Sequence, residues 1–536
     1  MADIGRRQFL KGAALGVAGI AAAGTLGACA PKAEETPQAG MTEDGASAGA
    51  GGGFEEGQYA FEIAPDPIPE DQVAEAIDVD ICVIGAGLAG TTAALAAGNL
   101  GAKTIVLQKA PQVHTFGRIA AVWNAEVQKE AGIELDTNEM LSVWNTVNFG
   151  FADTRVVKMF LETSGECIDF INRIAEENGL EHKWEVHPNG QQFIQWSDAS
   201  NYHRQLTFCQ QMTPVIEGMG VEYRYNTPAI YLEQDDSGRV TGVIAHDDRD
   251  DKYIRVNASK GVIVCTGDIG NDEKMVEKYA PPAVGVPSAY IGGYDTGDGQ
   301  KMMMWAGAQM QKLPYCSGIH LDPTTLPEGD APWSDYSWLA VTTQGKRFMN
   351  EGMWYQSKVA AALTQTDIVF YQIGGPDMKT FCEENPDARA YTWDDAYARG
   401  AIIEAASVGE LAGKIGVDEA TLEETVARYN ELYEAGVDGD FGKPAEDFAS
   451  TYIPPEGPIY AIKRSPGALG IFGGAATTPR LEVLDGENNV VEGLYAAGLT
   501  VGRFYGYEYP QECGATQAGR CLCNGIMAVR FALGDA

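Results

Sequence analysis

Short apolar runs alternate with helix-forming segments along the chain. Ile81–Ile84 and Thr104–Leu107 are mostly aliphatic, which is typical of buried strands, and Thr91–Gly98 between them is a small-residue segment that suits a closely packed helix. Two more apolar runs predict buried strands that end in turns of small residues, at Lys260–Thr266 and Glu492–Gly498. This alternation predicts an α/β fold.

Three glycines with the spacing G-x-G-x-x-G join the first strand to the first helix. Gly85 permits a tight turn, Gly87 lets the backbone approach a pyrophosphate, and Gly90 allows close packing of helix on strand. The helix N-terminus then presents unpaired N–H groups to the phosphates. The motif predicts dinucleotide binding. Gln108 ends the second strand, where an acidic residue normally accepts hydrogen bonds from the ribose hydroxyls. Because glutamine offers a neutral carbonyl oxygen, we expect the hydrogen bond to the ribose to be weaker but still present.

The N-terminus predicts an export signal. Arg6 and Arg7 precede the mild apolar run 12–28, which is typical of a twin-arginine signal in residues 1–29. Cys29 closes a segment that resembles a lipoprotein cleavage box, and an ordinary cleavage site with an incidental cysteine is the alternative. Residues 30–75 are rich in Ala, Gly, Glu and Pro and predict a disordered linker. We therefore expect an extracytoplasmic protein that is anchored to the membrane if Cys29 is lipidated.

Composition narrows the function further. The net charge of −37 disfavours nucleic acid and anionic lipid surfaces as partners. Cys82 and Cys265 lie in predicted buried strands, and the spacing of Cys513, Cys521 and Cys523 argues against an iron–sulfur cluster. The histidines show no metal-ligand spacing, so no metal site is predicted. The protein is expected to need an external electron donor, such as a membrane or extracytoplasmic redox protein.

The order of several motifs resembles one flavoprotein family. The glycine motif, the strand and turn at 260–268, Tyr294–Gly299, Gly345–Glu351 and Glu492–Gly498 together resemble the fumarate reductase/3-ketosteroid dehydrogenase family over roughly residues 78–536. The resemblance implies FAD as the cofactor. It also implies a Rossmann-like FAD-binding domain at 76–290 and 455–536, interrupted by a smaller α+β cap domain at 291–454, with the active site between the two. Helical periodicity at 422–434 and a polar stretch at 438–447 then predict a surface helix and a surface loop of the cap.

The resemblance also implies which residues contact the cofactor. Carried onto this sequence, the cofactor-binding positions are Gly85, Gly87, Ala89, Gly90, Gln108, Lys109, Ala229, Thr266, Gly267, Asp268, Gly498, Ala515 and Thr516. Lys346 and Arg347 belong to the motif at 345–351, and we expect them to form ion pairs or to contact the cofactor.

Three tyrosines stand where the fumarate-reducing branch has an arginine after its N-E motif and a later histidine and arginine. They are Tyr355, Tyr505 and Tyr509. Tyrosine offers a neutral O–H donor on an apolar ring, whereas arginine binds carboxylates bidentately. The pattern is similar to the 3-ketosteroid dehydrogenase branch, although one extra residue separates Tyr509 from Gly514. An aromatic core or subunit contact is the structural alternative, and Arg503 is a candidate for holding one carboxylate.

The predicted reaction is reduction of a C=C bond conjugated to a carbonyl on a small-molecule substrate, or its reverse. Flavin N5 gives hydride to the β-carbon, Tyr509 and the Gly514 N–H stabilise the oxygen, and Tyr355 protonates the α-carbon. Tyr505 is expected to form a wall of the pocket. Two alternatives stay open. One is a reductase of unsaturated carboxylates of the fumarate, urocanate or cinnamate kind, using Arg503 or another arginine, and the other is a flavin electron-transfer lipoprotein without turnover.

Overall fold

The computed structural model describes most of the chain after its N-terminal segment. The described residues are 59–188, 190–201, 203–287, 293–312, 314–321, 333, 336–385, 392–448, 451–506, 509 and 514–535. All of them belong to one compact unit, residues 56–536. The predicted export signal, Cys29 and the linker up to residue 58 lie outside the described residues. Within the described part, no helix combines the length and apolar character that a membrane span needs.

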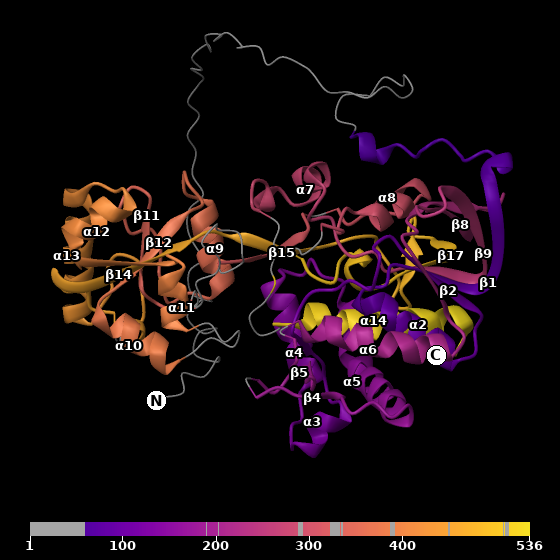
Figure 1. Cartoon of the computed structure of the whole chain (residues 1–536), viewed down its shortest axis with the longest axis horizontal. Coiled ribbons are helices and arrows are strands. Elements are labelled where there is room, and N and C mark those ends of the chain that lie inside the picture. Colours follow the sequence, from indigo (N-terminus) through magenta and orange to yellow (C-terminus); the bar gives the residue numbers. More distant parts are fainter. Residues whose placement is uncertain are drawn as a thin grey trace, which may run out of the picture. The chain divides into compact units, whose positions relative to one another are not determined.

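An eight-stranded sheet confirms the predicted α/β fold (Figure 1). Its parallel strands have the order β17–β9–β1–β2–β6, β16 is antiparallel at one edge, and the antiparallel pair β7–β8 joins through β9. The end of β1 is buried without interruption, as expected for a central parallel strand. The strands are β1 (Val73–Ile84), β2 (Thr104–Gln108), β6 (Glu222–Tyr225), β7 (Ala229–Gln234), β8 (Val240–Asp247), β9 (Lys252–Val264), β16 (Glu482–Leu484) and β17 (Val490–Ala496).

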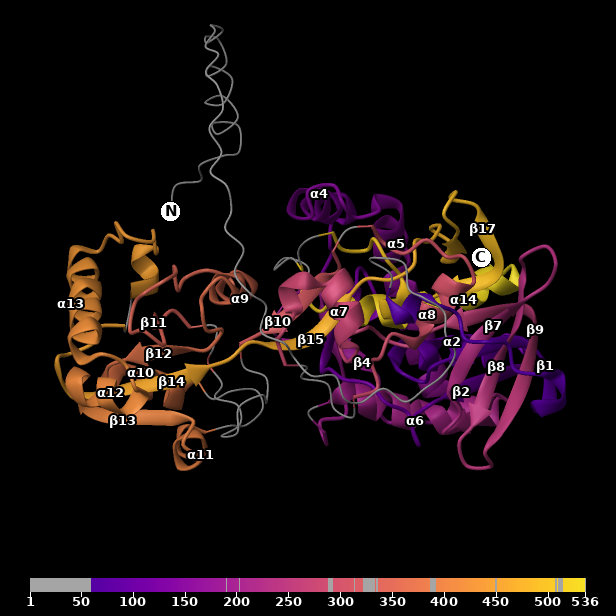
Figure 2. The same ribbon diagram turned by 90° about the horizontal axis from the view of Figure 1, so that it is seen from above.

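Small residues bring two helices close together. α2 (Leu88–Asn99) follows β1, and the C-terminal helix α14 (Thr516–Leu533) packs along it (Figures 1 and 2). A Cβ at Gly525 of α14 would lie 2.2 Å from the carbonyl oxygen of Ala89, so a side chain there would force the helices apart. The C-terminal helix is therefore held directly against the helix of the predicted dinucleotide turn.

Further helices and a three-stranded antiparallel sheet, β3–β5–β4, surround this core. The amphipathic helix α5 contributes one apolar face to it, including Val157, Phe160 and Ile171. These elements are β3 (Ile119–Ala121), β4 (Trp184–Val186), β5 (Phe193–Trp196), α3 (Glu126–Glu130), α4 (Thr137–Val147), α5 (Thr154–Glu177), α6 (Arg204–Gly218), α7 (Glu273–Tyr279), α8 (Asp298–Trp305), η2 (Ala60–Glu62), η3 (Glu70–Gln72), η4 (Pro281–Ala283) and η6 (Gly498–Thr500).

A second, four-stranded antiparallel sheet has the order β11–β12–β14–β13 and its own apolar core. β10 and β15 form a separate antiparallel pair, and β15 begins three residues after β14 ends. The elements are β10 (Cys316–His320), β11 (Leu339–Thr342), β12 (Phe370–Gly374), β13 (Ile402–Ser407), β14 (Glu456–Arg464), β15 (Gly467–Phe472), α9 (Tyr355–Leu363), α10 (Pro376–Glu384), α11 (Trp393–Ala398), α12 (Val408–Ile415), α13 (Glu419–Ala435) and η5 (Ala445–Phe448).

Three details differ from the sequence analysis. The linker was predicted to reach residue 75, but Phe61 is already buried and β1 begins at Val73. The second sheet continues past residue 454, because β14 pairs with both β12 and β13. α13 confirms the predicted helix at 422–434, whereas the polar loop after it is not entirely on the surface, since Asp438 and Lys443 are buried by ion pairing.

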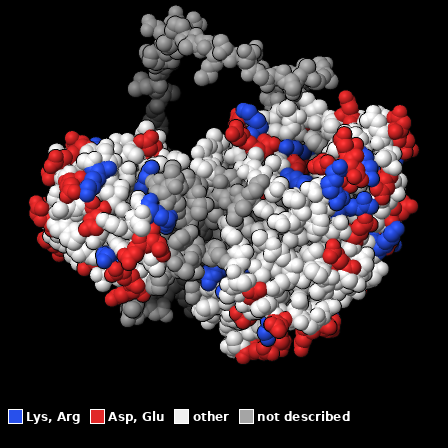
Figure 3. Space-filling view, in the orientation of Figure 1, with Lys and Arg blue, Asp and Glu red and all other residues white. Residues whose placement is uncertain are grey.

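The surface carries the excess of acidic residues that the composition requires. Figure 3 shows Asp and Glu side chains gathered mainly toward the outer edges of the visible face, with Lys and Arg side chains interspersed among them and uncharged residues over its middle. Many of the basic residues are paired, as Arg255 is with Glu70 and Glu233. Such a face is unfavourable for binding polyanions.

Candidate active site

The glycine motif forms a cradle between β1 and α2. Gly85 has φ +100°, and a Cβ there would lie 2.5 Å from the carbonyl oxygen of Cys265. A Cβ at Gly90 would lie 1.9 Å from the Gly85 carbonyl oxygen, so Gly90 permits the close packing that its place in the motif predicts. Gly87 precedes α2 and makes no side-chain cap, and a Cβ there would meet only the His114 carbonyl oxygen at 3.3 Å. The cradle and the uncapped helix N-terminus fit a pyrophosphate.

Gln108, at the end of β2, stabilises this glycine turn by hydrogen bonds. It is buried, its Oε1 accepts a hydrogen bond from the Ala86 N–H at 3.3 Å, and its Nε2 donates to the Gln112 carbonyl at 3.1 Å. The side chain predicted to bind a ribose thus also supports the glycine turn. The Nζ of the next residue, Lys109, lies 2.8 Å from Asp298 Oδ2 at the start of α8.

Ala229 and the turn after β9 complete the edge of the sheet. The N–H of Thr227 donates to the Gln108 carbonyl at 2.9 Å, which brings Ala229, at the start of β7, near the end of β2. Gly267 follows β9 with φ +80°. Asp268 is fully buried, and its carboxylate accepts hydrogen bonds from the N–H groups of Gly270 and Ile471 at 2.7 and 3.1 Å. Asp268 therefore ties this turn to β15.

A second acid, Asp295, closes over the same turn. A Cβ at Gly267 would lie 2.2 Å from Asp295 Oδ1, so glycine is required for this contact. The hydroxyl of Thr266 is buried and has no hydrogen-bond partner in the part of the chain that the structure describes. Burial raises the pKa of Asp295 to about 6, although the Asp268 N–H and the charge of Lys109 act to lower it. The sequence analysis used the motif around Asp295 only for the family resemblance and did not identify the acid as part of the site.

The last predicted cofactor residues meet at the N-termini of α2 and α14. A Cβ at Gly498, which has φ +70°, would lie 2.9 Å from the Ala89 Cβ and 3.1 Å from Cys521 Sγ. Ala515 precedes α14 with φ +59° and no side-chain cap, and its carbonyl accepts a hydrogen bond from the Ala121 N–H at 3.0 Å. The structure thus brings residues far apart in sequence around one end of the parallel sheet.

Aromatic rings pack beside the N-terminus of α14. Tyr505 is fully buried, stacks on Trp144 with a centroid distance of 5.4 Å, and lies 5.3 Å from the ring of Tyr509. Its hydroxyl lies 2.6 Å from Thr516 Oγ1, and burial raises its pKa well above the ordinary value. Tyr509 is buried to 8% exposure and its ring is 5.3 Å from that of Phe472 in β15. Tyr505 is thus packed among aromatic rings beside the start of α14.

One of the predicted catalytic residues, Tyr355, is described only in part. The backbone of Tyr355 begins α9, directly after Trp354, and its side chain lies outside the described part of the chain. Gly514 lies in the turn immediately before α14. Residues 510–513, including Cys513, also lie outside the described part.

Arg503 has partners of its own. Its backbone has φ +60°, its N–H donates to Gln311 Oε1 at 2.6 Å, and its carbonyl accepts from the Asp153 N–H at 2.6 Å. Its side chain is 38% exposed, and its Nη2 lies 3.7 Å from Asp153 Oδ2. A substrate carboxylate at Arg503 would compete with this acid.

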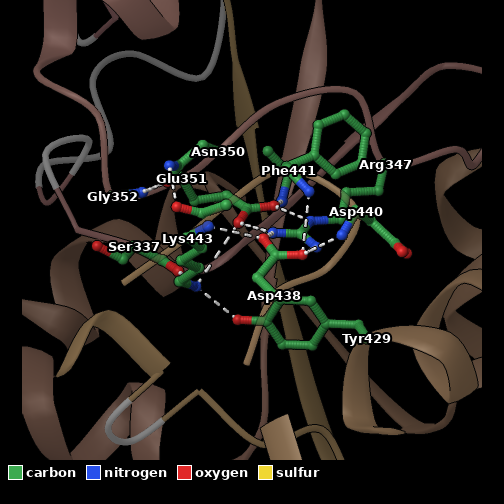
Figure 4. Close-up of polar contacts among 12 residues, drawn as sticks. Ser337, Arg347, Asn350, Glu351, Gly352, Tyr429, Asp438, Asp440, Phe441 and Lys443 are labelled. Atoms are coloured by element: carbon green, nitrogen blue, oxygen red, sulfur yellow. Dashed lines mark hydrogen bonds and ion pairs between the residues drawn. The ribbon is translucent and has the colours of Figure 1, made fainter. Parts of the chain in front are cut away.

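Arg347 forms a buried ion cluster rather than a free cationic site (Figure 4). Its Nη2 lies 2.8 Å from both Glu351 Oε2 and Asp438 Oδ2. Lys443 Nζ lies 3.6 Å from Glu351 Oε2 and donates to the Tyr429 hydroxyl at 2.7 Å. Burial acts to raise the pKa of Asp438, but hydrogen bonds from Arg347 and from backbone N–H groups lower it to about 2. The cluster confirms the ion pair expected for Arg347 and explains why the polar loop turns inward.

One buried cation was not among the residues predicted from the sequence. Arg520 lies in α14 at 1% exposure, among buried apolar neighbours such as Leu522 and Ile526. A single charged residue within an otherwise buried helical stretch was the available signal.

A glycine cradle at one end of a parallel sheet, a closing turn at Gly498 and an aromatic cluster packed against β15 define a dinucleotide-binding protein of the α/β class. The chain matches the FAD-binding domain family over residues 80–515 and belongs to that family.

Relatives and solved structures agree with this assignment. The chain is 27% identical over 448 residues to a fumarate reductase (cytochrome) from Shewanella frigidimarina, covering 80% of this chain and 73% of that protein. It is 25% identical over 547 residues to a 3-oxosteroid 1-dehydrogenase from Mycolicibacterium smegmatis, covering 81% and 94%. The fold is similar to that of a flavocytochrome c3 fumarate reductase in its open conformation, with a TM-score of 0.70, 22% identity and coverage of 89% and 82%. The protein is an FAD-dependent oxidoreductase that acts on CH–CH groups.

Proposed function

We propose that the protein reduces a C=C bond conjugated to a carbonyl group on a largely apolar substrate. The observation that carries the proposal is the aromatic character of the site beside α14. Tyr505, Tyr509 and Phe472 pack with ring centroids 5.3–5.6 Å apart, so the wall is apolar apart from the phenol groups. An apolar wall with O–H donors suits a ketone better than a small dianion.

Each residue has a defined task in this proposal. Bound FAD, once reduced, supplies hydride for the β-carbon of the substrate. The Tyr509 O–H and the Gly514 N–H hold the carbonyl oxygen as it gains negative charge. Tyr355 gives its proton to the α-carbon, which completes the saturation of the C=C bond. Tyr505 shapes the wall and is anchored by its hydroxyl contact with Thr516 at 2.6 Å. The reverse reaction, dehydrogenation of a saturated ketone, uses the same groups.

The direct test is a reoxidation assay. The purified holoprotein is reduced without oxygen and mixed with a panel of enones, 3-ketosteroids and unsaturated acids, while the return of oxidised flavin absorbance is followed. Fast reoxidation by enones supports the proposal. Reoxidation by unsaturated acids alone would instead identify a carboxylate reductase. If no organic acceptor reoxidises the flavin, the electron-transfer alternative is favoured.

One observation keeps the carboxylate alternative in view. Arg503 is engaged by Asp153, but Arg520 is buried close to Tyr505 and has no acidic partner among the described residues. A carboxylate reductase would be inhibited by small carboxylates in competition with the substrate, whereas an enone reductase acting on neutral substrates would not.

We further infer that the protein is exported and receives electrons from an external donor. The twin-arginine pattern at Arg6 and Arg7 and the cysteine at position 29 support this inference. Replacing both arginines with lysine should leave folded, flavin-loaded protein in the cytoplasm. Cys29→Ala should move the protein from the membrane fraction to the soluble fraction. If Cys29→Ala fractionates like wild type, Cys29 carries no lipid anchor, and export is then judged by the arginine variants alone.

A further inference from the structure

Arg520 is a buried cation that the proposed mechanism does not use. Its Nη1 donates one hydrogen bond to the Val501 carbonyl at 3.3 Å. Its Nε and Nη2 are buried and have no hydrogen-bond partner among the described residues. Burial lowers the pKa of Arg520, and the side chains that most oppose this shift, Tyr505, Cys521, Cys316 and Tyr509, include no carboxylate. Removing a charge from water is unfavourable unless another group compensates it.

The position of this charge is specific. The guanidinium carbon lies 4.7 Å from the centroid of the Phe504 ring and 5.3 Å from that of Tyr505, so Arg520 holds both rings by cation–π contact. The Tyr505 hydroxyl in turn contacts Thr516 in the first turn of α14. Arg520 therefore connects, through one aromatic ring, to the helix N-terminus where the cofactor and carbonyl groups are predicted.

Two sources of positive potential meet there. The N-terminus of α14 has no side-chain cap, and its backbone dipole favours negative charge. Arg520 adds a full charge one turn further along the same helix. By contrast, Arg530 near the end of α14 is paired with Glu166 at 2.6 Å. Within the described chain, the cation near the site is therefore the one left without an acid.

We propose that Arg520 is a positioning residue that holds Tyr505 and supplies the positive charge for an anionic oxygen of the bound ligand at the N-terminal turn of α14. Two bound ligands could present a delocalised negative charge on an oxygen atom at this position. One is the reduced flavin and the other is a substrate that carries a carboxylate or develops an enolate. If the ligand is the substrate, the inference rests on the proposed function. If the ligand is the flavin, the inference is independent of the proposed function.

The test compares neutral variants with a matched control on the same helix. Full-length holoprotein is prepared as wild type, Arg520→Met, Arg520→Gln, Arg520→Lys and Arg530→Met. The midpoint potential of the bound flavin is measured without substrate. The affinity of the oxidised holoprotein for cinnamate and for para-nitrophenolate, which mimic a carboxylate and an enolate, is measured from the flavin spectrum.

The results distinguish the two ligands. A lower flavin potential in the neutral Arg520 variants, partly restored in Arg520→Lys, identifies the flavin as the ligand. Probe binding that is weaker by tenfold or more at an unchanged potential identifies the substrate. A packing role alone would not be rescued by lysine, because the ammonium restores charge rather than shape.

Three results would overturn the proposal. They are an unchanged potential together with unchanged probe affinity in the neutral variants, equal changes in Arg530→Met, and failure of both neutral variants to fold. The last result would mean that Arg520 serves the fold itself. If wild type turns over none of the panel substrates but the flavin potential falls in Arg520→Met, the proposed function fails and the inference on Arg520 stands.

Discussion

Replacing Gly90 by alanine tests whether the glycine cradle is what binds the cofactor. Gly90 lies in the first turn of α2 and has ordinary helical geometry, so alanine would by itself favour the helix. The obstacle is tertiary. The added Cβ would lie 1.9 Å from the Gly85 carbonyl oxygen and 2.8 Å from the Gly85 carbonyl carbon.

The size of the effect follows from these distances. Cβ atoms in real structures essentially never approach another atom within 3.0 Å, so the start of α2 must move away from Gly85 by about 1 Å. Overpacking of this kind costs about 1–3 kcal/mol. If FAD binding requires the original turn, the same cost weakens FAD affinity by roughly 5- to 150-fold.

The assay measures flavin content and thermal unfolding of purified Gly90→Ala beside a matched control. Gly413→Ala in α12 is suitable, because Gly413 is helical and a Cβ there meets no atom within 4 Å. Gly413→Ala should keep full flavin and gain about 0.4–1 kcal/mol of stability. Gly90→Ala should be less stable and depleted of flavin. Normal flavin content and an unchanged Tm in Gly90→Ala would refute the assignment of the cradle.

Three more predictions concern proton transfer, oxygen binding and the buried ion cluster. Tyr355→Phe should lower turnover by roughly 10²–10⁴-fold while substrate still binds in a flavin-difference titration, and wild-type turnover would remove Tyr355 from the mechanism. Tyr509→Phe should lower kcat/KM by roughly 10²-fold with flavin content unchanged, and a normal kcat/KM would reduce Tyr509 to a pocket wall. Because the pKa of Asp438 is about 2 in the folded protein and 3.8 ordinarily, its ionised form stabilises the fold above about pH 4, and this stability is lost as the pH falls through 2. Asp438→Asn should therefore cost about 2 kcal/mol in urea unfolding at pH 7 and flatten the acid dependence, whereas an unchanged acid profile would contradict the pKa assignment.

The sequence by itself determined the local elements of the cofactor site. A glycine fixes where the chain can turn with positive φ, and an unbroken aliphatic run fixes a buried strand, so Gly85, the end of β1 at Ile81–Ile84 and β2 were predictable from neighbouring residues alone. The helical period at residues 422–434 likewise predicted α13. These features depend on interactions within a few residues, which a linear pattern records directly.

Only the tertiary structure decided which side chains are buried together. Asp438 and Lys443 look like surface residues in a polar loop, yet Arg347 and Glu351, about 90 residues earlier, bury and pair them. Arg520 looks like an ordinary helical arginine until Phe504 and Tyr505 enclose it. The cost of burying a charge depends on the groups that surround it in space, and sequence distance does not record those groups. The glycine cradle could therefore be predicted from the sequence, whereas the burial and pairing of the charged side chains depend on the tertiary structure.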